Sequence, residues 1–247
     1  MDSYGSNTVG NGRRGARRRL RLRLGLWLLA TAEGRSCDDA PRGSRRRLPS
    51  VRALATAAGV HRNTAAAAYR DLQRFGLVHS VRGAGTFAVE SPARSWTQFG
   101  APVCSDPGLA GVLSAELRRP VSVTTAGDRR RPLLVPLDES PPAGRRVVPV
   151  APRGPALLAL RRLSPGSTVH LVSDSPRLGR LVRHAILALH GESVGLARTQ
   201  RARPAPELSG VGLGLVDLRQ LSPRGTDVGL EGLIPLMLLI GSDRNAG

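Results

Sequence analysis

The stretch LPSVRALATAAGVHRNTAAAAYRDLQRFGLVHSVRGAGTF, residues 48–87, decides how the first part of this 247-residue chain folds. Ser50 is a good helix N-cap, and apolar residues follow it at helical spacing as far as Gly59, which suits a left-handed stop. A second helix is predicted from about Arg62 to Phe75, again ended by a glycine, Gly76. Two helices joined by so tight a turn have the geometry of a helix-turn-helix.

The end of the same stretch predicts a hairpin. LVHSV and TFAVE are short alternating strands, and the glycines of the intervening RGAG permit a tight reversal. A helix-turn-helix followed by a hairpin is a winged helix. The second helix should bury Ala65, Ala68, Tyr69 and Leu72. Ala66 and Ala67 should leave the opposite face short, so that contacts are concentrated at the start of the helix.

These pieces resemble the DNA-binding domain of the GntR family of bacterial transcription regulators. LPSVRALA, GVHRNTAAAAYRDLQRFGL and RGAGTF occur in the family's order and spacing, over roughly residues 48–90 plus the preceding helix. The recognition helix is similar to those of the MocR and YtrA branches. MocR members continue into an aminotransferase-like domain, for which the roughly 150 remaining residues are too few. The chain also has no lysine to hold pyridoxal phosphate, so a MocR assignment is rejected.

The resemblance implies a sequence-specific regulator of the GntR type, acting as a repressor rather than an activator. Residues that open a recognition helix reach base edges in the major groove, where arginine can pair with guanine and asparagine with adenine. His61 is as well suited to capping the helix as to touching DNA. The expected contacts are Arg52, His61, Arg62, Asn63, Thr64, Arg82 and Gly83, with Arg45, Arg46 and Arg47 as a phosphate patch.

Composition favours a polyanionic partner. The formal net charge is +19, and all 37 basic residues are arginine, with 17 of them in residues 1–90. Double-stranded nucleic acid is the leading partner, with an anionic membrane surface second. Chemistry that needs a lysine, such as a Schiff base, is excluded, and no cofactor is expected. Cys37 and Cys104 are too few for a disulfide framework and are interpreted as free thiols in a reducing cytoplasm, although a single bridge stays open.

Before the helix-turn-helix, residues 1–12 are small and polar, which predicts a disordered tail, and residues 13–90 form the winged-helix domain. The arginine-rich start and the apolar run LGLWLLATA imitate a secretory signal. An amphipathic helix from about Arg17 to Ala32 accounts better for the spacing of the leucines. Residues 91–108 are rich in Pro, Gly and Ser and are the predicted linker.

Residues 109–247 predict an α/β module with a mostly parallel sheet, for effector sensing or for dimerisation only. A helix in LAGVLSAELRR precedes apolar runs that alternate with helical patterns, such as STVHLVSD before SPRLGRLVRHAILALHG. Ligands of open parallel sheets bind beyond the carboxyl ends of strands. The candidate effector residues there are Ser173, Asp174, Ser175 and Asp217, which serve equally as helix caps and loop residues. The histidines lack metal-ligand spacing, and no metal site is predicted.

Together these patterns predict a cytoplasmic, nucleoid-associated regulator that is not an enzyme. Because operator palindromy mirrors two-fold protein symmetry, a homodimer is expected. A small-molecule effector is an open expectation, and no membrane partner is expected. Two alternatives stay open: a nonspecific arginine-rich nucleic-acid binder, and the remnant of a cofactor-dependent enzyme.

Overall fold

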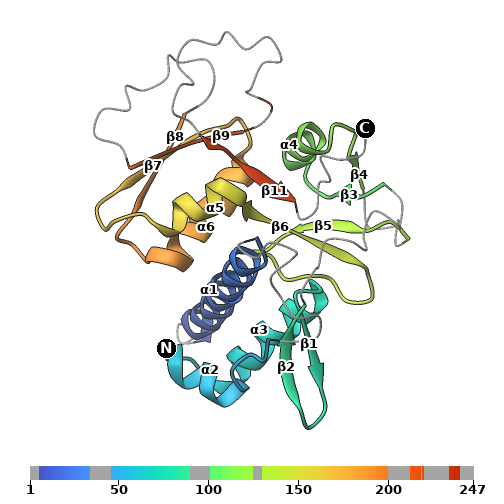
Figure 1. Cartoon of the computed structure of the whole chain (residues 1–247), viewed down its shortest axis with the longest axis vertical. Helices are drawn as coiled ribbons and strands as arrows, with labels where there is room; N and C mark the ends of the chain where they lie inside the picture. Colours follow the sequence, from blue (N-terminus) through green and yellow to red (C-terminus); the bar gives the residue numbers. More distant parts are fainter. Residues whose placement is uncertain are drawn as a thin grey trace, which may run out of the picture.

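The computed structural model describes residues 6–33, 46–89, 101–124, 130–199, 212–217, 219 and 234–239. A helix-turn-helix part lies at one end, a larger α/β part forms the rest, and the first helix lies between them (Figure 1). The first part contains α1 (Ser6–Glu33), α2 (Val51–Ala57), α3 (Arg62–Arg74), β1 (Val78–Val81) and β2 (Gly85–Ala88).

Local chemistry sets the ends of α2 and α3, as the sequence predicts. The Ser50 hydroxyl caps α2 by accepting a hydrogen bond from the Ala53 amide at 3.1 Å. Gly59 and Gly76 have φ of +60° and +68°, a backbone conformation that favours glycine after a helix. Strands β1 and β2 pair antiparallel over four residue pairs directly after α3. The described order is therefore helix, turn, helix, hairpin.

Helix α1 is longer than expected. It begins at Ser6 instead of about Arg17, so the predicted disordered tail is wrong for residues 6–12, and residues 1–5 lie outside the described part of the chain. Its first buried side chain is Leu20, and from there to Ala30 most side chains are buried. This buried half contacts α3 on one side and α5 and α6 of the α/β part on the other.

The α/β part contains two sheets instead of the single sheet predicted. The first has the strand order β11-β6-β5-β3-β4, in which only β11 runs antiparallel to its neighbour. The second has the order β10-β9-β7-β8 and is parallel throughout. The strands are β3 (Val103–Cys104), β4 (Ser122–Val123), β5 (Leu133–Pro136), β6 (Val147–Arg153), β7 (Thr168–Val172), β8 (Gly195–Thr199), β9 (Leu213–Val216), β10 (Ile234–Pro235) and β11 (Met237–Leu239).

The connecting helices are α4 (Pro107–Leu117), α5 (Gly154–Arg161) and α6 (Pro176–His190). Helix α6 is capped as predicted, because the Ser175 hydroxyl accepts a hydrogen bond from the Leu178 amide at 3.2 Å and Gly191 follows its last turn. The predicted linker boundary is wrong at its end. Residues 91–100 lie outside the described part, but residues 103–104 form β3 and α4 begins at Pro107.

The core also departs from a simple division into two domains. One apolar cluster joins α1, α2, α3 and β1 to Leu133, Val135 and Leu137 of the first sheet region and to Ala185 and Ala188 of α6. A second cluster lies within the α/β part alone. Since the first cluster crosses the predicted boundary near residue 90, the two parts share buried surface through α1.

Candidate nucleic-acid interface

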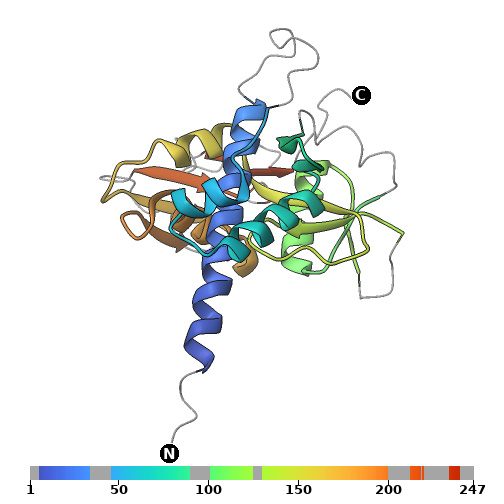
Figure 2. The ribbon, with the colours of Figure 1, turned by 90° about the horizontal axis from the view of Figure 1, so that it is seen from below.

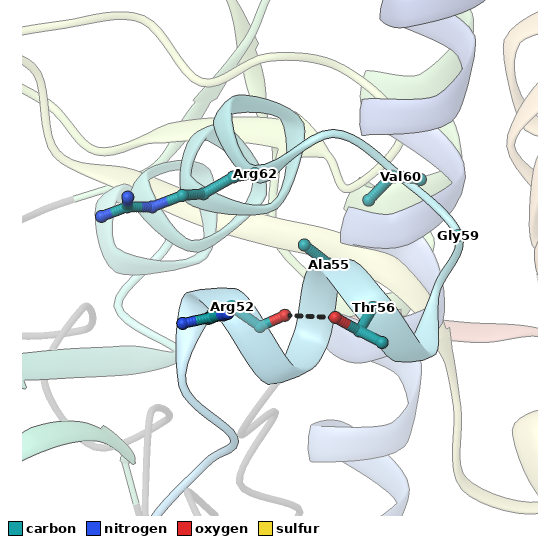
Figure 3. Close-up of a pocket in the computed structure, with 6 residues that line it drawn as sticks. All are labelled: Arg52, Ala55, Thr56, Gly59, Val60 and Arg62. Atoms are coloured by element: carbon teal, nitrogen blue, oxygen red, sulfur yellow. Dashed lines mark hydrogen bonds between the residues drawn. The ribbon is translucent and has the colours of Figure 1, made fainter.

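A hollow between α2 and α3 brings two arginines to one face of the helix pair. It is lined by Arg52, Ala55, Thr56, Gly59, Val60 and Arg62. In Figure 3 the side chains of Arg52 and Arg62 extend in the same direction, away from the turn at Gly59. Both side chains are exposed. The Thr56 hydroxyl donates to the Arg52 carbonyl at 3.1 Å, within α2. Two exposed guanidinium groups can therefore approach an anionic ligand from two helices at once.

The start of α3 holds the residues with hydrogen-bonding capacity. Arg62 and Asn63 are exposed and Thr64 is partly exposed, so all three remain accessible to a ligand. His61 is the N-cap of α3, where its Nδ1 accepts a hydrogen bond from the Asn63 amide at 3.1 Å. Of the two roles open to His61, capping is the one its geometry displays. Its ring is also exposed.

The alanine run of α3 is packed more closely than predicted. Ala65 and Ala68 are fully buried, as expected, and Ala66 is partly exposed. The sequence places Ala67 on the open face, but it is 8% exposed and belongs to the core. The reason is that both α1 and α2 pack against α3, so a wider stripe of α3 is buried than α2 alone would cover. Tyr69 is also buried, and burial raises the pKa of its hydroxyl to about 12.

The three arginines expected to form a phosphate patch before α2 do not share one environment. Arg45 lies outside the described residues. The guanidinium of Arg46 lies 4.0 Å from the ring centroid of Trp27 on α1, a cation–π contact that engages the side chain. Arg47 is exposed and forms an isolated bridge with Phe87, so it lies along the hairpin. Arg47 is thus the more available of the two described arginines.

The hairpin tip presents the predicted Arg82 and Gly83 in the turn between β1 and β2. Both are exposed, and Gly83 has φ of +78°. The turn is closed by a hydrogen bond from the Ala84 amide to the Val81 carbonyl at 3.1 Å. Figure 1 shows the hairpin, α2 and α3 together at the same end of the molecule.

Asp71 on α3 makes a buried ion-pair group that sequence patterns did not reveal. Its carboxylate accepts from Arg17 Nε at 2.8 Å and from Arg21 Nη1 at 2.6 Å, both on α1. Arg21 Nε also donates to the Leu137 carbonyl at 2.8 Å, after β5. Asp71 is 0% and Arg21 2% exposed, so the pair is dry. These bonds fix the orientation of α3 against α1 and link both to the α/β part.

A second buried charged group lies just beyond β5. Asp138 accepts from Arg177 at 2.7 Å and lies 2.6 Å from His184 Nδ1, both on α6. Burial alone would raise the pKa of Asp138, but hydrogen bonds from His184 and Arg177 outweigh burial and lower that pKa to about 2. From the sequence, the only signal for this group is the position of Asp138 just after an apolar run. That position does not identify Arg177 and His184 as its partners.

The four predicted effector residues lie together at the carboxyl ends of β7 and β9. The Ser173 hydroxyl donates to Asp217 at 2.9 Å and accepts from the Ser175 amide at 3.1 Å. Asp217 also pairs with Arg219 at 2.8 Å. Ser173, Ser175 and Asp217 are buried, and only Asp174 is exposed. Their hydrogen bonds stabilise the strand ends and the start of α6, and a ligand contact there stays a prediction.

Metal ligands and cysteine thiols are the other reactive groups to consider in the described part of the chain. Among those residues, no three His, Cys, Asp or Glu side chains gather as metal ligands. Cys104 is free and buried, and burial raises the pKa of its thiol. Cys37 lies outside the described residues.

The helices of the described residues can be compared with the length and apolarity of a membrane-spanning helix. None of these helices combines the length and the apolarity that a bilayer span requires.

A helix-turn-helix whose second helix opens with exposed Arg62 and Asn63 and partly exposed Thr64 has the arrangement by which helix-turn-helix domains contact DNA. Residues 44–88 match the family described as "Bacterial regulatory proteins, gntR family". This part of the chain is therefore a GntR-family DNA-binding domain, which confirms the resemblance seen in the sequence.

One curated relative gives a further comparison. Over 45 residues the chain is 44% identical to the "HTH-type transcriptional repressor YtrA" of Bacillus subtilis (strain 168). The match covers 18% of this chain and 35% of that repressor. No solved structure matches the chain significantly.

Proposed function

We propose that this protein is a sequence-specific transcriptional repressor that binds operator DNA as a homodimer. The observation that supports it best is the exposed opening of α3, Arg62, Asn63 and Thr64, beside Arg52 in a GntR-family domain. These side chains have the donors and acceptors that distinguish base pairs in the major groove. Arg82 and Gly83 at the hairpin tip suit contacts to a phosphate or to the minor groove, as in a winged helix.

The repressor role rests on the similarity to YtrA, whose name describes it as a transcriptional repressor. Such a protein acts where the chromosome is, at the nucleoid in the cytoplasm. Dimerisation follows from the two-fold symmetry of operators, which places two recognition helices about one helical turn of DNA apart. The α/β part supplies the surface for dimerisation and a place for a small-molecule effector near Asp174. No enzymatic step is part of the proposal.

The test starts by selecting bound sequences from a random duplex pool with the full chain. The selected duplex and a scrambled duplex are then titrated at about 0.15 M salt, where charge contacts are moderated. Arg62→Ala should weaken binding to the selected duplex by about 1–3 kcal/mol and relax the preferred base at one position. Arg161→Ala, which removes an exposed arginine at the end of α5, is the matched control and should change neither quantity.

Equal binding to selected and scrambled duplexes would refute the proposal in favour of a nonspecific nucleic-acid binder. Equal weakening on both duplexes for Arg62→Ala would remove the base-contact role of Arg62. Sedimentation of the protein with and without the duplex tests the homodimer. A two-to-one complex on a palindromic duplex is expected.

A further inference from the structure

The first half of α1 carries arginines that lie outside the GntR-family match at residues 44–88. No side chain from Arg13 to Arg19 is buried, and Figure 2 shows this half of α1 extending beyond the rest of the ribbon. Arg17 is the member of the segment that pairs with Asp71. The others, Arg13, Arg14, Arg18 and Arg19, form what we call the α1 arginine cluster. Within the described residues, none of the four forms an ion pair with a carboxylate.

Charge within this segment is unbalanced. Helix α1 has no acidic residue in its first turn, and the sequence has none between Asp2 and Glu33. Arg14 and Arg18 are four residues apart, and so are Arg19 and Arg23, which places like charges next to each other on the helix surface. Such pairs destabilise a helix, because charges of the same sign repel across one turn. A polyanion would relieve this repulsion, because each bound phosphate places a negative charge beside an arginine whose nearest charged neighbour is otherwise positive.

The position of the cluster is set by the recognition helix itself. Arg17 lies between the two halves of the cluster and is bound to Asp71, as is Arg21 one turn later. Asp71 is nine residues after Arg62 on α3, which is about 13 Å along a helix that rises about 1.5 Å per residue. The major groove is about 12 Å wide. Asp71 therefore holds the cluster beside the far end of α3, more than one groove width from Arg62 along the helix axis and outside the base pairs that the start of α3 reaches.

We infer that the α1 arginine cluster binds the phosphate backbone of duplex DNA that flanks the base pairs contacted by α3. This inference rests on the proposed function and extends the DNA-binding surface beyond the helix-turn-helix and the hairpin. Arginine donates to phosphate oxygens in bidentate geometry and needs no particular base sequence. The flanking contact therefore adds affinity without adding base preference.

The test compares the salt dependence of binding on two duplexes with the same selected core. One duplex ends at the core, and the other has about 10 base pairs, roughly one helical turn, added on each side. The variant Arg13→Gln/Arg14→Gln/Arg18→Gln/Arg19→Gln keeps good helix formers and removes no buried side chain, so it should fold. Its matched control, with the same reduction of charge, is Arg161→Gln/Arg162→Gln/Arg180→Gln/Arg183→Gln, at exposed positions at the end of α5 and in α6.

A plot of log K against log salt has a negative slope. On the long duplex, the magnitude of this slope should decrease by about 0.9 for every phosphate that a variant no longer neutralises. With four arginines replaced, the α1 variant should therefore show a slope smaller by up to about 3.6. The selected-to-scrambled affinity ratio should stay as in the unmodified protein. On the short duplex the slopes of the α1 variant and the unmodified protein should differ by less than about 0.9. The half variants, Arg13→Gln/Arg14→Gln and Arg18→Gln/Arg19→Gln, should each remove part of the slope.

Failure of this inference is distinct from failure of the proposed function. An unchanged slope with preserved sequence selection would overturn the flanking contact and leave the repressor proposal standing. The same decrease in slope on both duplexes, or from the α5 and α6 control, would overturn it as well. If the protein selects no sequence at all, both proposals are wrong. Weaker binding of the α1 variant to phosphatidylserine vesicles, without any change on DNA, would assign the cluster to membranes instead.

Discussion

Replacing Asp71 with Asn removes the charge that balances a buried arginine between the two parts of the protein. Arg21 is 2% exposed and keeps only the Leu137 carbonyl and the Ser140 hydroxyl, at 2.8 and 3.3 Å, once the carboxylate is gone. Burial lowers the pKa of Arg21, and the hydrogen bond and charge of Asp71 offset only part of this effect, so the charged guanidinium depends on its partner. Breaking a buried pair by removing one member costs about 3–5 kcal/mol.

The loss of stability that comes from the Arg21–Asp71 pair can be separated from that of the Arg17–Asp71 pair. Arg17 is 33% exposed, so water solvates it when the pair is broken, and Arg17→Gln should cost only about 0–1 kcal/mol. The double variant Arg21→Met/Asp71→Leu removes both buried charges and fills the site with apolar side chains. Because it leaves no buried ion, its stability should lie within about 2 kcal/mol of the unmodified protein.

Urea unfolding followed by circular dichroism measures these free energies, and thermal scans give a second readout. For a chain of this size a change of about 1 kcal/mol corresponds to about 2–4 °C, so Asp71→Asn should lower Tm by roughly 6–20 °C. The assigned dependence of Arg21 on Asp71 is refuted if Asp71→Asn costs no more than Arg17→Gln, or if the double variant is the least stable of the set. Either result would mean that Arg21 is solvated or paired elsewhere.

Two further predictions concern other contacts of the same region. The lowered pKa of Asp138, about 2 against an ordinary 3.8, stabilises the fold by about 2 kcal/mol above pH 4. That stabilisation disappears as the pH falls through about 2, so Asp138→Asn should flatten the urea stability profile between about pH 4 and 2, and an unchanged profile would contradict the assignment. Gly25→Ala would place a Cβ 2.5 Å from a Leu137 methyl and should lower stability by about 1–3 kcal/mol. Gly15→Ala, with nothing within 4 Å, should raise it by up to about 1 kcal/mol, and the same sign in both variants would contradict the packing of α1 on Leu137.

Local signals explain why the helix-turn-helix could be predicted from the sequence. A serine cap, two glycines with positive φ and a glycine-rich reversal each act within a few residues. The exposed positions of Arg52, Arg62 and Asn63 followed from the same pattern, because N-terminal and solvent-facing positions of a helix are set by its period. Helix α6 was equally predictable from Ser175, its apolar stripe and Gly191.

Contacts between distant residues explain what the sequence did not reveal. The sequence pattern of α3 gives no sign that Asp71 is buried and paired, because its partners Arg17 and Arg21 lie 54 and 50 residues away. Ala67 is buried for the same reason, since α1 covers a face that an isolated helix pair would expose.

Short strands and a change of sheet could not be predicted for geometric reasons. β3 and β4 have two residues each, too few for any alternation to show. β5 is flanked by Pro132 and ends at Pro136, residues that disfavour a strand prediction although its four side chains are buried. The apolar run LIPLMLLIGS, residues 233–242, has the pattern of a single strand, but it contains both β10 and β11, which separate at Leu236 and join different sheets.

The position of Arg21 has a consequence for small-molecule control. Ser175 caps α6, Arg177 on the same helix pairs with Asp138, and the neighbouring Leu137 carbonyl binds Arg21, the partner of Asp71. These hydrogen bonds, linked to one another through the backbone of α6 and the Leu137–Asp138 peptide, join the strand ends of the α/β part to α3. Continuity alone does not establish energetic coupling, which requires that both ends bias the same two-state element. The stable Arg21→Met/Asp71→Leu variant isolates this question, because it removes the polar connection and retains the apolar packing. If an effector acts through the connection, this variant binds operator DNA but no longer responds to the effector.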